Sequence, residues 1–153
     1  MLTHPPILST PERPDGVMAK PNSARHERTR HDHRNETAED YVEAVAELIE
    51  ENEVCRVTNL ARHFAVSHVT VSKTVSRLKT AGLLTSQPYG PIELTRKGRR
   101  LAAKSKQRHQ IVLDFLLALG ISQRIAEMDA EGIEHHVSNE TLRQFRNFTE
   151  SQT

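Results

Sequence analysis

Two short segments between residues 57 and 80 constrain the fold of this chain more than any other feature of its sequence. Residues 57–64 and residues 68–80 each place apolar side chains at helical spacing, and only Ala65-Val66-Ser67 separates them. Gly82 follows the second segment, at a position where glycine commonly ends a helix. The pattern therefore predicts two helices joined by a tight turn, which is the helix-turn-helix arrangement.

The second predicted helix has one apolar face and one polar face. Val71, Val75 and Leu78 repeat at i, i+4 and i+7 and leave small polar and basic residues on the opposite side. Such a face suits a helix that enters the major groove of DNA, which is about 12 Å wide. An ordinary amphipathic helix with a solvated face is the alternative. The candidate DNA-contacting residues, including one from the turn that follows, are Ser67, His68, Thr70, Lys73, Thr74, Arg77 and Tyr89.

A predicted hairpin comes directly after the helix-turn-helix. Strand-like segments at residues 83–87 and 92–94 flank the turn Pro88-Tyr89-Gly90-Pro91. A long helical segment then begins at about Thr95, a capping residue, and runs to about Leu119. Helix, helix-turn-helix, hairpin and helix is the order of a winged-helix domain.

The charges are distributed unevenly along the chain, although the formal net charge is only +1. Residues 56–108 carry 12 Lys and Arg against one acidic residue, whereas residues 39–55 carry 7 acidic residues and no Lys or Arg. Residues 109–153 carry 7 acidic residues against 3 basic ones. The basic block is typical of nucleic-acid binding, and we expect the two acidic blocks to supply the two halves of a cation site.

A further helix is predicted before the helix-turn-helix, capped by Thr37 and running to about Asn52. Asp40 and Glu43 are three residues apart in it, so they project about 60° from each other around the helix axis. A carboxylate pair near a helix N-terminus also needs no metal, because the helix dipole stabilises it. Residues 1–35 hold five of the seven prolines and few large apolar residues, so we expect them to form a disordered N-terminal tail.

The segment Glu131-Gly132-Ile133-Glu134-His135-His136 is rich in side chains that bind metals. If it is helical, Glu131, Glu134 and His135 lie at i, i+3 and i+4 and share one face. Like charges one turn apart repel each other, and a divalent cation would reverse that repulsion. Acidic helix faces are also common on solvated surfaces, so this spacing alone leaves both interpretations open.

Apolar residues recur at helical spacing from His109 to the C-terminus, on helices that Gly120, Ser122 and Ser138 delimit. Three short helices bury little surface by themselves, so we expect them to pack against a second copy in a two-fold dimer. A single histidine on such a stripe, as at His109, is more often a core residue than a ligand. The candidate dimer contacts are Leu116, Leu142, Phe145 and Phe148.

The remaining composition restricts the cellular setting and the chemistry. Cys55 is the only cysteine, which excludes a disulfide within the chain and favours a reducing compartment. No apolar run approaches the roughly 20 residues of a membrane span, and no signal peptide is recognisable. We therefore expect a cytoplasmic protein without a membrane partner. The hydrolase motifs H-E-x-x-H and G-x-S-x-G do not occur, which disfavours the alternative of a metal-dependent hydrolase.

Taken together, these segments resemble the manganese branch of the diphtheria-toxin-repressor family of metal-dependent transcriptional repressors, over about residues 36–150. The residues that carry the resemblance are Asp40-Tyr41-Val42-Glu43, the turn residues Val66-Ser67, Leu94-Thr95 through Gly98, Arg108-His109 and the segment Glu131 to His136. No single one of these pieces would be specific, whereas their combination at these separations is.

The resemblance implies a mainly α fold. It implies a winged helix-turn-helix DNA-binding domain over residues 36–105 and a small all-helical metal-binding and dimerisation domain over residues 106–153. It further implies a repressor of manganese uptake genes, not an enzyme, that binds double-stranded DNA at a palindromic operator as a homodimer. The implied metal ligands are Asp40, Glu43, His109, Glu131, Glu134 and His135.

The implied cofactor is Mn²⁺, with one or two ions per chain and Fe²⁺ as the alternative ion; no organic cofactor is expected. The iron-responsive branch of the family has Met at the position of Asp40 and Cys at that of Glu131, and oxygen ligands with imidazole suit Mn²⁺ better. The resemblance implies that the metal bridges the two domains and fixes the DNA-competent dimer. The main alternative is a metal-independent winged-helix regulator that senses a small organic ligand.

Overall fold

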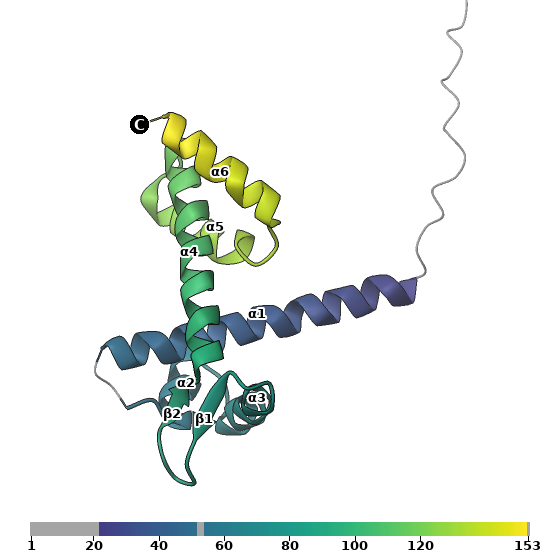
Figure 1. Ribbon diagram of the computed structural model, residues 1–153, viewed down its shortest axis with the longest axis vertical. Helices are drawn as coiled ribbons and strands as arrows, with labels where there is room; N and C mark the ends of the chain where they lie inside the picture. The colour runs from purple at the N-terminus through teal and green to yellow at the C-terminus, as the bar shows by residue number, and fades with distance from the viewer. Residues whose placement is uncertain (1–21, 52–53, 153) are drawn as a thin grey trace, which may run out of the picture.

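The computed structural model describes residues 22–51 and 54–152. The fold of this part is mainly α, with one small sheet (Figure 1). The helices and strands are, in order, α1 (Asn22–Glu50), α2 (Val57–Phe64), α3 (His68–Thr80), β1 (Leu84–Ser86), β2 (Ile92–Leu94), α4 (Arg96–Ala118), α5 (Gln123–Ile133) and α6 (Asn139–Ser151). The winged-helix order and the bounds of both helix-turn-helix segments are confirmed.

Helix starts are set by side chains that accept a hydrogen bond from the first turn. Ser67, Thr95 and Ser138 each accept from the backbone N–H three residues further on, at the starts of α3, α4 and α6. Ser122 precedes α5 in extended conformation but makes no such bond. The predicted caps at Thr95 and Ser138 are therefore confirmed in full.

The two strands form an antiparallel hairpin, in which Leu84 pairs with Leu94 and Ser86 pairs with Ile92. The hairpin packs closely on the start of α4 at Gly98. A Cβ added to Gly98 would lie 2.1 Å from the carbonyl oxygen of Leu83, a backbone atom that cannot swing away. Glycine is thus required at position 98 because the Leu83 backbone lies so close to it, and not because its φ angle is unusual.

Two hydrophobic cores lie at the two ends of α4, which is the element they share. The first contains residues of α1, α2, α3, both strands and Ala102 of α4, with Tyr41 stacked on Phe64 at 4.4 Å between ring centroids. The second contains residues of α4, α5 and α6, with Phe115 stacked on Phe145 at 3.9 Å. Figure 1 shows α4 rising from the winged helix to α5 and α6.

The first helix is longer than the sequence indicates. It begins at Asn22 and not at Thr37, so residues 22–35, predicted to be disordered, are helical, while residues 1–21 lie outside the described part. Thr37 is no cap: its hydroxyl donates to the carbonyl of His33 one turn earlier. The extension has no large apolar residue, but pairs one turn apart such as Arg28–Asp32 (3.9 Å) support it as a continuation of the packed helix.

Helices that could cross a membrane are absent from the part of the chain that the structure describes.

Candidate metal centre and DNA-binding face

The six residues predicted as metal ligands come from four separate elements. Asp40 and Glu43 lie on α1, His109 on α4 and Glu131 on α5, whereas Glu134 and His135 lie in the turn that follows α5. Contacts between α1 and α4 and between α4 and α5 bring these elements together (Figure 1). The fold therefore places residues that are up to 95 positions apart around one point.

The helix that carries Glu131 ends earlier than predicted. The last residue of α5 is Ile133, so Glu134 and His135 follow the helix, although Glu134 keeps helical backbone angles (φ −56°, ψ −35°). The backbone N–H of Glu134 still donates to Ala130, but the chain then turns. Arg108 of α4 fixes this turn, because its guanidinium donates to the carbonyls of Glu134 (3.1 Å from Nε) and Val137 (3.0 Å from Nη2). Arg108 thereby sets the position of two candidate ligands.

Glu134 lies at the centre of the cluster and is 2% exposed. Its Oε2 is 2.6 Å from Nδ1 of His109, and its Oε1 is 3.5 Å from Nε2 of His135. Burial raises the pKa of Glu134, while the two histidines oppose that rise. Glu131 lies at the margin: its side chain is 72% exposed, and its Oε1 is 3.6 Å from Nδ1 of His109.

Both ring nitrogens of His135 face carboxylates. Nε2 is 3.3 Å from Oδ1 of Asp40, and Nδ1 is 2.8 Å from Oε2 of Glu39. Hydrogen bonds to Asp40 and Glu39 raise the pKa of His135 to about 10, against the opposing effect of burial. Glu39 was not among the predicted site residues. Its neighbour Asp40 has the same chemistry, so only the packing of α1 against the turn after α5 distinguishes their roles.

Glu43 is half-buried between α1 and α4. Burial and the nearby carboxylate of Glu134 raise the pKa of Glu43 from 4.5 to about 7. The hydroxyl of Ser105 lies close enough to lower this pKa in part. The Ser105 hydroxyl nevertheless makes no hydrogen bond of normal geometry. Among the described residues, its oxygen is the buried side-chain polar atom that lacks a hydrogen-bond partner. A half-buried carboxylate and an unsatisfied hydroxyl together form a polar site that the protein's own groups do not complete.

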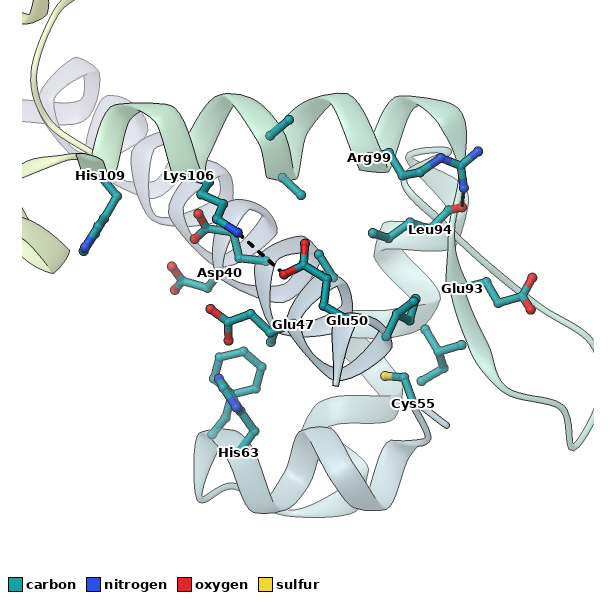
Figure 2. A pocket seen from close by; sticks show the side chains of 18 of the residues that line it. Asp40, Glu47, Glu50, Cys55, His63, Glu93, Leu94, Arg99, Lys106 and His109 are labelled. Carbon is teal, nitrogen blue, oxygen red and sulfur yellow. Dashed lines mark hydrogen bonds and ion pairs between the residues drawn. The ribbon is translucent and has the colours of Figure 1, made fainter. Parts of the chain in front are cut away.

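The cluster opens into a groove of about 1170 Å³ between α1 and α4. Carboxylates of α1 line one side of it, and Figure 2 shows Asp40, Glu47 and Glu50 there, opposite His109 and Lys106 of α4. Lys106 reaches across to Glu50, with Nζ 3.6 Å from Oε2. The groove gives the cluster access from solvent along an acidic wall.

The donor atoms of the cluster suit a hard or borderline divalent cation. Carboxylate oxygens with imidazole nitrogens favour ions such as Mn²⁺, whereas soft ions prefer sulfur. However, Nδ1 of His109 and both ring nitrogens of His135 already contact carboxylates. Among the residues that the structure describes, no group of three or more His, Cys, Asp or Glu side chains is arranged to hold a metal ion as it stands. The residue types fit such an ion, and side-chain rotations would have to accompany its binding.

Most of the predicted DNA-contacting residues of α3 are accessible to a partner. His68, Thr70, Lys73 and Arg77 are exposed, and Thr74 is half-buried. Ser67 instead caps α3, with its hydroxyl accepting from the N–H of Thr70 at 3.2 Å.

The turn of the hairpin presents Tyr89, whose side chain is fully exposed. Its φ of +61° lies in the left-handed region, which is unfavourable for a residue other than glycine. Arg56 donates from Nη1 to the carbonyl of Tyr89 at 3.1 Å and holds the turn in this conformation. An exposed aromatic side chain on a fixed turn is available for contact with DNA.

The predicted dimer contacts do not all face outward. Leu116 and Leu142 are buried in the chain's own second core, and Phe145 stacks inside it on Phe115. Phe148 is partly exposed, and so are further large apolar residues of the same region: Leu119, Ile121 and Met128. These side chains, unlike those of Leu116 and Leu142, are accessible for contact with a second copy.

Comparison with known proteins identifies relatives of both parts of the chain. Residues 34–92 match the family model described as iron dependent repressor, N-terminal DNA binding domain, and residues 95–152 match the iron dependent repressor metal binding and dimerisation domain. The transcriptional regulator MntR of Escherichia coli O6:H1 is 49% identical over 118 residues, which are 77% of this chain and 76% of the relative. MntR of Bacillus subtilis is 36% identical over 100 residues, 65% of this chain and 70% of the relative.

Two solved structures at 28% identity have the same arrangement. The manganese regulator SloR superposes with a TM-score of 0.65 over 74% of this chain and 53% of that one. A manganese-dependent transcriptional repressor in complex with manganese superposes with a TM-score of 0.66 over 74% and 52%. The chain thus spans about half the length of these two proteins.

Proposed function

Because the chain belongs to the MntR branch of the iron-dependent-repressor family of metal-dependent transcriptional regulators, we propose that it represses manganese uptake genes when Mn²⁺ binds between its two cores. The family members are DNA-binding regulators, so the chain is a metal-dependent regulator and not an enzyme, and the alternative of an organic-ligand sensor has no support. A divalent metal, DNA and a second copy of the chain are its partners.

The proposal rests on one observation above all, the buried carboxylate of Glu134. It lies between two imidazoles and close to the carboxylate of Glu43, at the place where α1 of the first core meets the elements of the second. The proposed ligands are Asp40 and Glu43 from the DNA-binding half, with His109, Glu131, Glu134 and His135 from the other half. A bound divalent cation supplies the positive charge that offsets the repulsion among these carboxylates.

The residues of the chain couple this site to DNA binding through α1 and α4. When Asp40 and Glu43 are held against Glu134 and His135, the angle between α1 and α4 is fixed, and so is the position of α3 relative to the second core. In a two-fold dimer this angle sets the distance between the two α3 helices, which must be about 34 Å, or a multiple of it, for successive half-sites of a palindromic operator. Ligand binding thus shifts a population of orientations toward the DNA-competent one.

We further propose a division into residues 36–105 and 106–153, cytoplasmic localisation, and Mn²⁺ in preference to Fe²⁺. One or two ions per chain are both compatible with six donor residues. Raw affinity follows the Irving-Williams order for any such site. Selection of Mn²⁺ must therefore come from coordination number, geometry and availability.

The test is a titration of metal-stripped protein with Mn²⁺, in which the signal of the free ion is followed by electron paramagnetic resonance. The wild-type chain should take up one or two ions per chain. Glu134→Gln should abolish this uptake, and Glu127→Gln on the exposed side of α5, which removes the same charge, should not. No saturable uptake by the wild-type chain would refute the proposal.

DNA binding is tested with duplexes selected from a random library in the presence of Mn²⁺. Their affinity should fall when the metal is removed, and by thermodynamic reciprocity they should tighten Mn²⁺ uptake by the same factor. A DNA affinity that does not depend on Mn²⁺ would contradict the coupling while leaving the metal site intact.

A further inference from the structure

Glu39 is not one of the proposed metal ligands, yet its side chain contacts the proposed ligand His135. Its Oε2 is 2.8 Å from Nδ1 of His135, although the two residues are 96 positions apart in the chain. The side chain of His135 is 5% exposed and that of Glu39 is 18% exposed, so the contact is shielded from water. A shielded hydrogen bond to a carboxylate is stronger and more directional than one at the surface.

The contact determines which edge of the imidazole ring faces the cluster. With Nδ1 bonded to Glu39, Nε2 points to the opposite side, where Oδ1 of Asp40 is at 3.3 Å and Oε1 of Glu134 at 3.5 Å. A neutral imidazole has one N–H and one lone pair, and its hydrogen bond decides which nitrogen carries the proton. When the ring gives up one proton to bind a metal, a carboxylate at Nδ1 retains the other proton there and leaves the lone pair on Nε2.

We propose that Glu39 is a positioning residue for metal binding: it accepts the Nδ1–H of His135 and keeps Nε2 directed at the carboxylates of Asp40 and Glu134. This inference rests on the proposed function. Histidines that bind metals generally donate their other N–H to a carboxylate or carbonyl, and loss of that partner typically weakens metal binding about 10- to 100-fold.

The position of Glu39 in the fold gives the contact a second consequence. Glu39 and Asp40 are neighbours on α1, and they contact opposite nitrogens of a histidine that belongs to the turn after α5. The orientation of a ligand in one half is thus set by a helix of the other half. Glu39 links the two halves before any metal is bound. The imidazole of His135 is therefore already oriented, and metal binding does not have to supply the free energy of orienting it.

Three variants separate the contact from its charge. Glu39→Gln removes the charge and keeps the size, and Glu39→Asp keeps the charge but shortens the side chain by one methylene and so breaks the 2.8 Å contact. Glu36→Gln is the matched control: Glu36 lies one turn earlier on α1, also lines the groove, and pairs with His33 at 3.4 Å instead of with His135. Circular dichroism and gel filtration establish that each variant is folded.

Mn²⁺ uptake by the full chain, followed by electron paramagnetic resonance, is the first readout. Glu39→Gln and Glu39→Asp should each weaken binding about 10- to 100-fold at unchanged stoichiometry. Glu36→Gln should change it less than about threefold, because salt screens a charge that makes no contact with the site.

The second readout is the proton spectrum of ¹⁵N-histidine-labelled, metal-free protein. The spectrum should contain a slowly exchanging, low-field signal from the ring N–H of His135. Loss of this signal in His135→Gln assigns it. The signal should be absent from Glu39→Gln and present in Glu36→Gln.

Unchanged Mn²⁺ affinity in both Glu39 variants would overturn the inference, and so would equal losses in Glu39→Gln and Glu36→Gln, which would indicate a general effect of charge. In either case normal uptake by the wild-type chain would leave the proposed function standing. Absence of uptake by the wild-type chain would refute the proposed function itself and this inference with it.

Discussion

Replacement of Glu43 by glutamine should stabilise the metal-free protein at alkaline pH. The pKa of Glu43 is about 7 in the folded chain against 4.5 for an ordinary glutamate, because the carboxyl is buried and faces the carboxylate of Glu134. A raised pKa means that the folded state holds this proton more tightly than the unfolded state. The resulting stabilisation is complete below pH 4.5 and is lost as the pH rises through 7.

The magnitude follows from the two pKa values. Each pKa unit corresponds to about 1.4 kcal/mol, so the interval from 4.5 to about 7 amounts to about 3 kcal/mol. Partial exposure of Glu43 reduces this to on the order of 2 kcal/mol. Glutamine stays neutral and escapes the cost, and its amide can also donate to the unsatisfied hydroxyl of Ser105.

Urea unfolding of chelator-treated protein at pH 8 and pH 4.5 measures the effect. With a slope of about 2 kcal/mol per M, the midpoint of Glu43→Gln should exceed that of the wild type by about 1 M at pH 8 and match it at pH 4.5. Glu47→Gln, one turn later on α1 and exposed, should shift it by less than about 0.5 kcal/mol. Excess Mn²⁺ should stabilise the wild type and not Glu43→Gln. A variant that is equally stable or less stable at pH 8 would refute the reasoning that burial penalises this carboxylate.

Further predictions concern packing, the ligand-bearing turn, DNA affinity and pH. Gly98→Ala should destabilise the fold by about 2 kcal/mol in urea unfolding, because its Cβ would collide with the Leu83 carbonyl, and a loss below 0.5 kcal/mol would contradict this. Arg108→Lys should weaken Mn²⁺ uptake and cost about 1–2 kcal/mol of stability, since an ammonium cannot reproduce the forked contacts to two carbonyls. Replacing Lys73 by Gln should reduce the slope of log affinity for DNA against log salt by about 0.9, which binding at several salt concentrations measures. Mn²⁺ affinity should rise from pH 6 to pH 8 with proton release, detectable in weakly buffered solution, because Glu43 and His135 have pKa values of about 7 and 10.

The features that the sequence predicted correctly are those with local signals. The bounds of α2 and α3 and the caps Thr95 and Ser138 depend on apolar spacing and on hydrogen bonds within three or four residues. The start of α1 could not be found this way, because residues 22–35 lack the apolar residues whose period marks a helix.

Two features of the site, the end of α5 and the contact of Glu39, could not be predicted for a different reason. The end of α5 at Ile133 has no terminal glycine to mark it, since Gly132 lies inside the helix, and the turn depends on Arg108 from α4. The contact between Glu39 and His135 depends on how α1 packs against a turn that is 96 residues away in the chain. Spacing within one segment indicated which residue types converge, whereas the orientation of each side chain is a property of tertiary packing.

The coupling between the metal site and the DNA-binding face depends on how firmly α3 is attached to α4. At the start of α4, the hydroxyl of Thr95 donates to the carbonyl of Gly82 at 2.6 Å, and Nζ of Lys97 donates to that of Ala81 at 2.8 Å. Both carbonyls lie just after the end of α3. Lys79 in the last turn of α3 in turn contacts Ser86 of β1, with Nζ 3.0 Å from Oγ. These contacts tie α3, the hairpin and the start of α4 together, so we expect them to reorient as one unit when the metal site changes the position of the second core. A site built only from flexible loops would absorb such a change, whereas Asp40, Glu43 and His109 lie on helices and Arg108 of α4 holds the turn that carries Glu134 and His135.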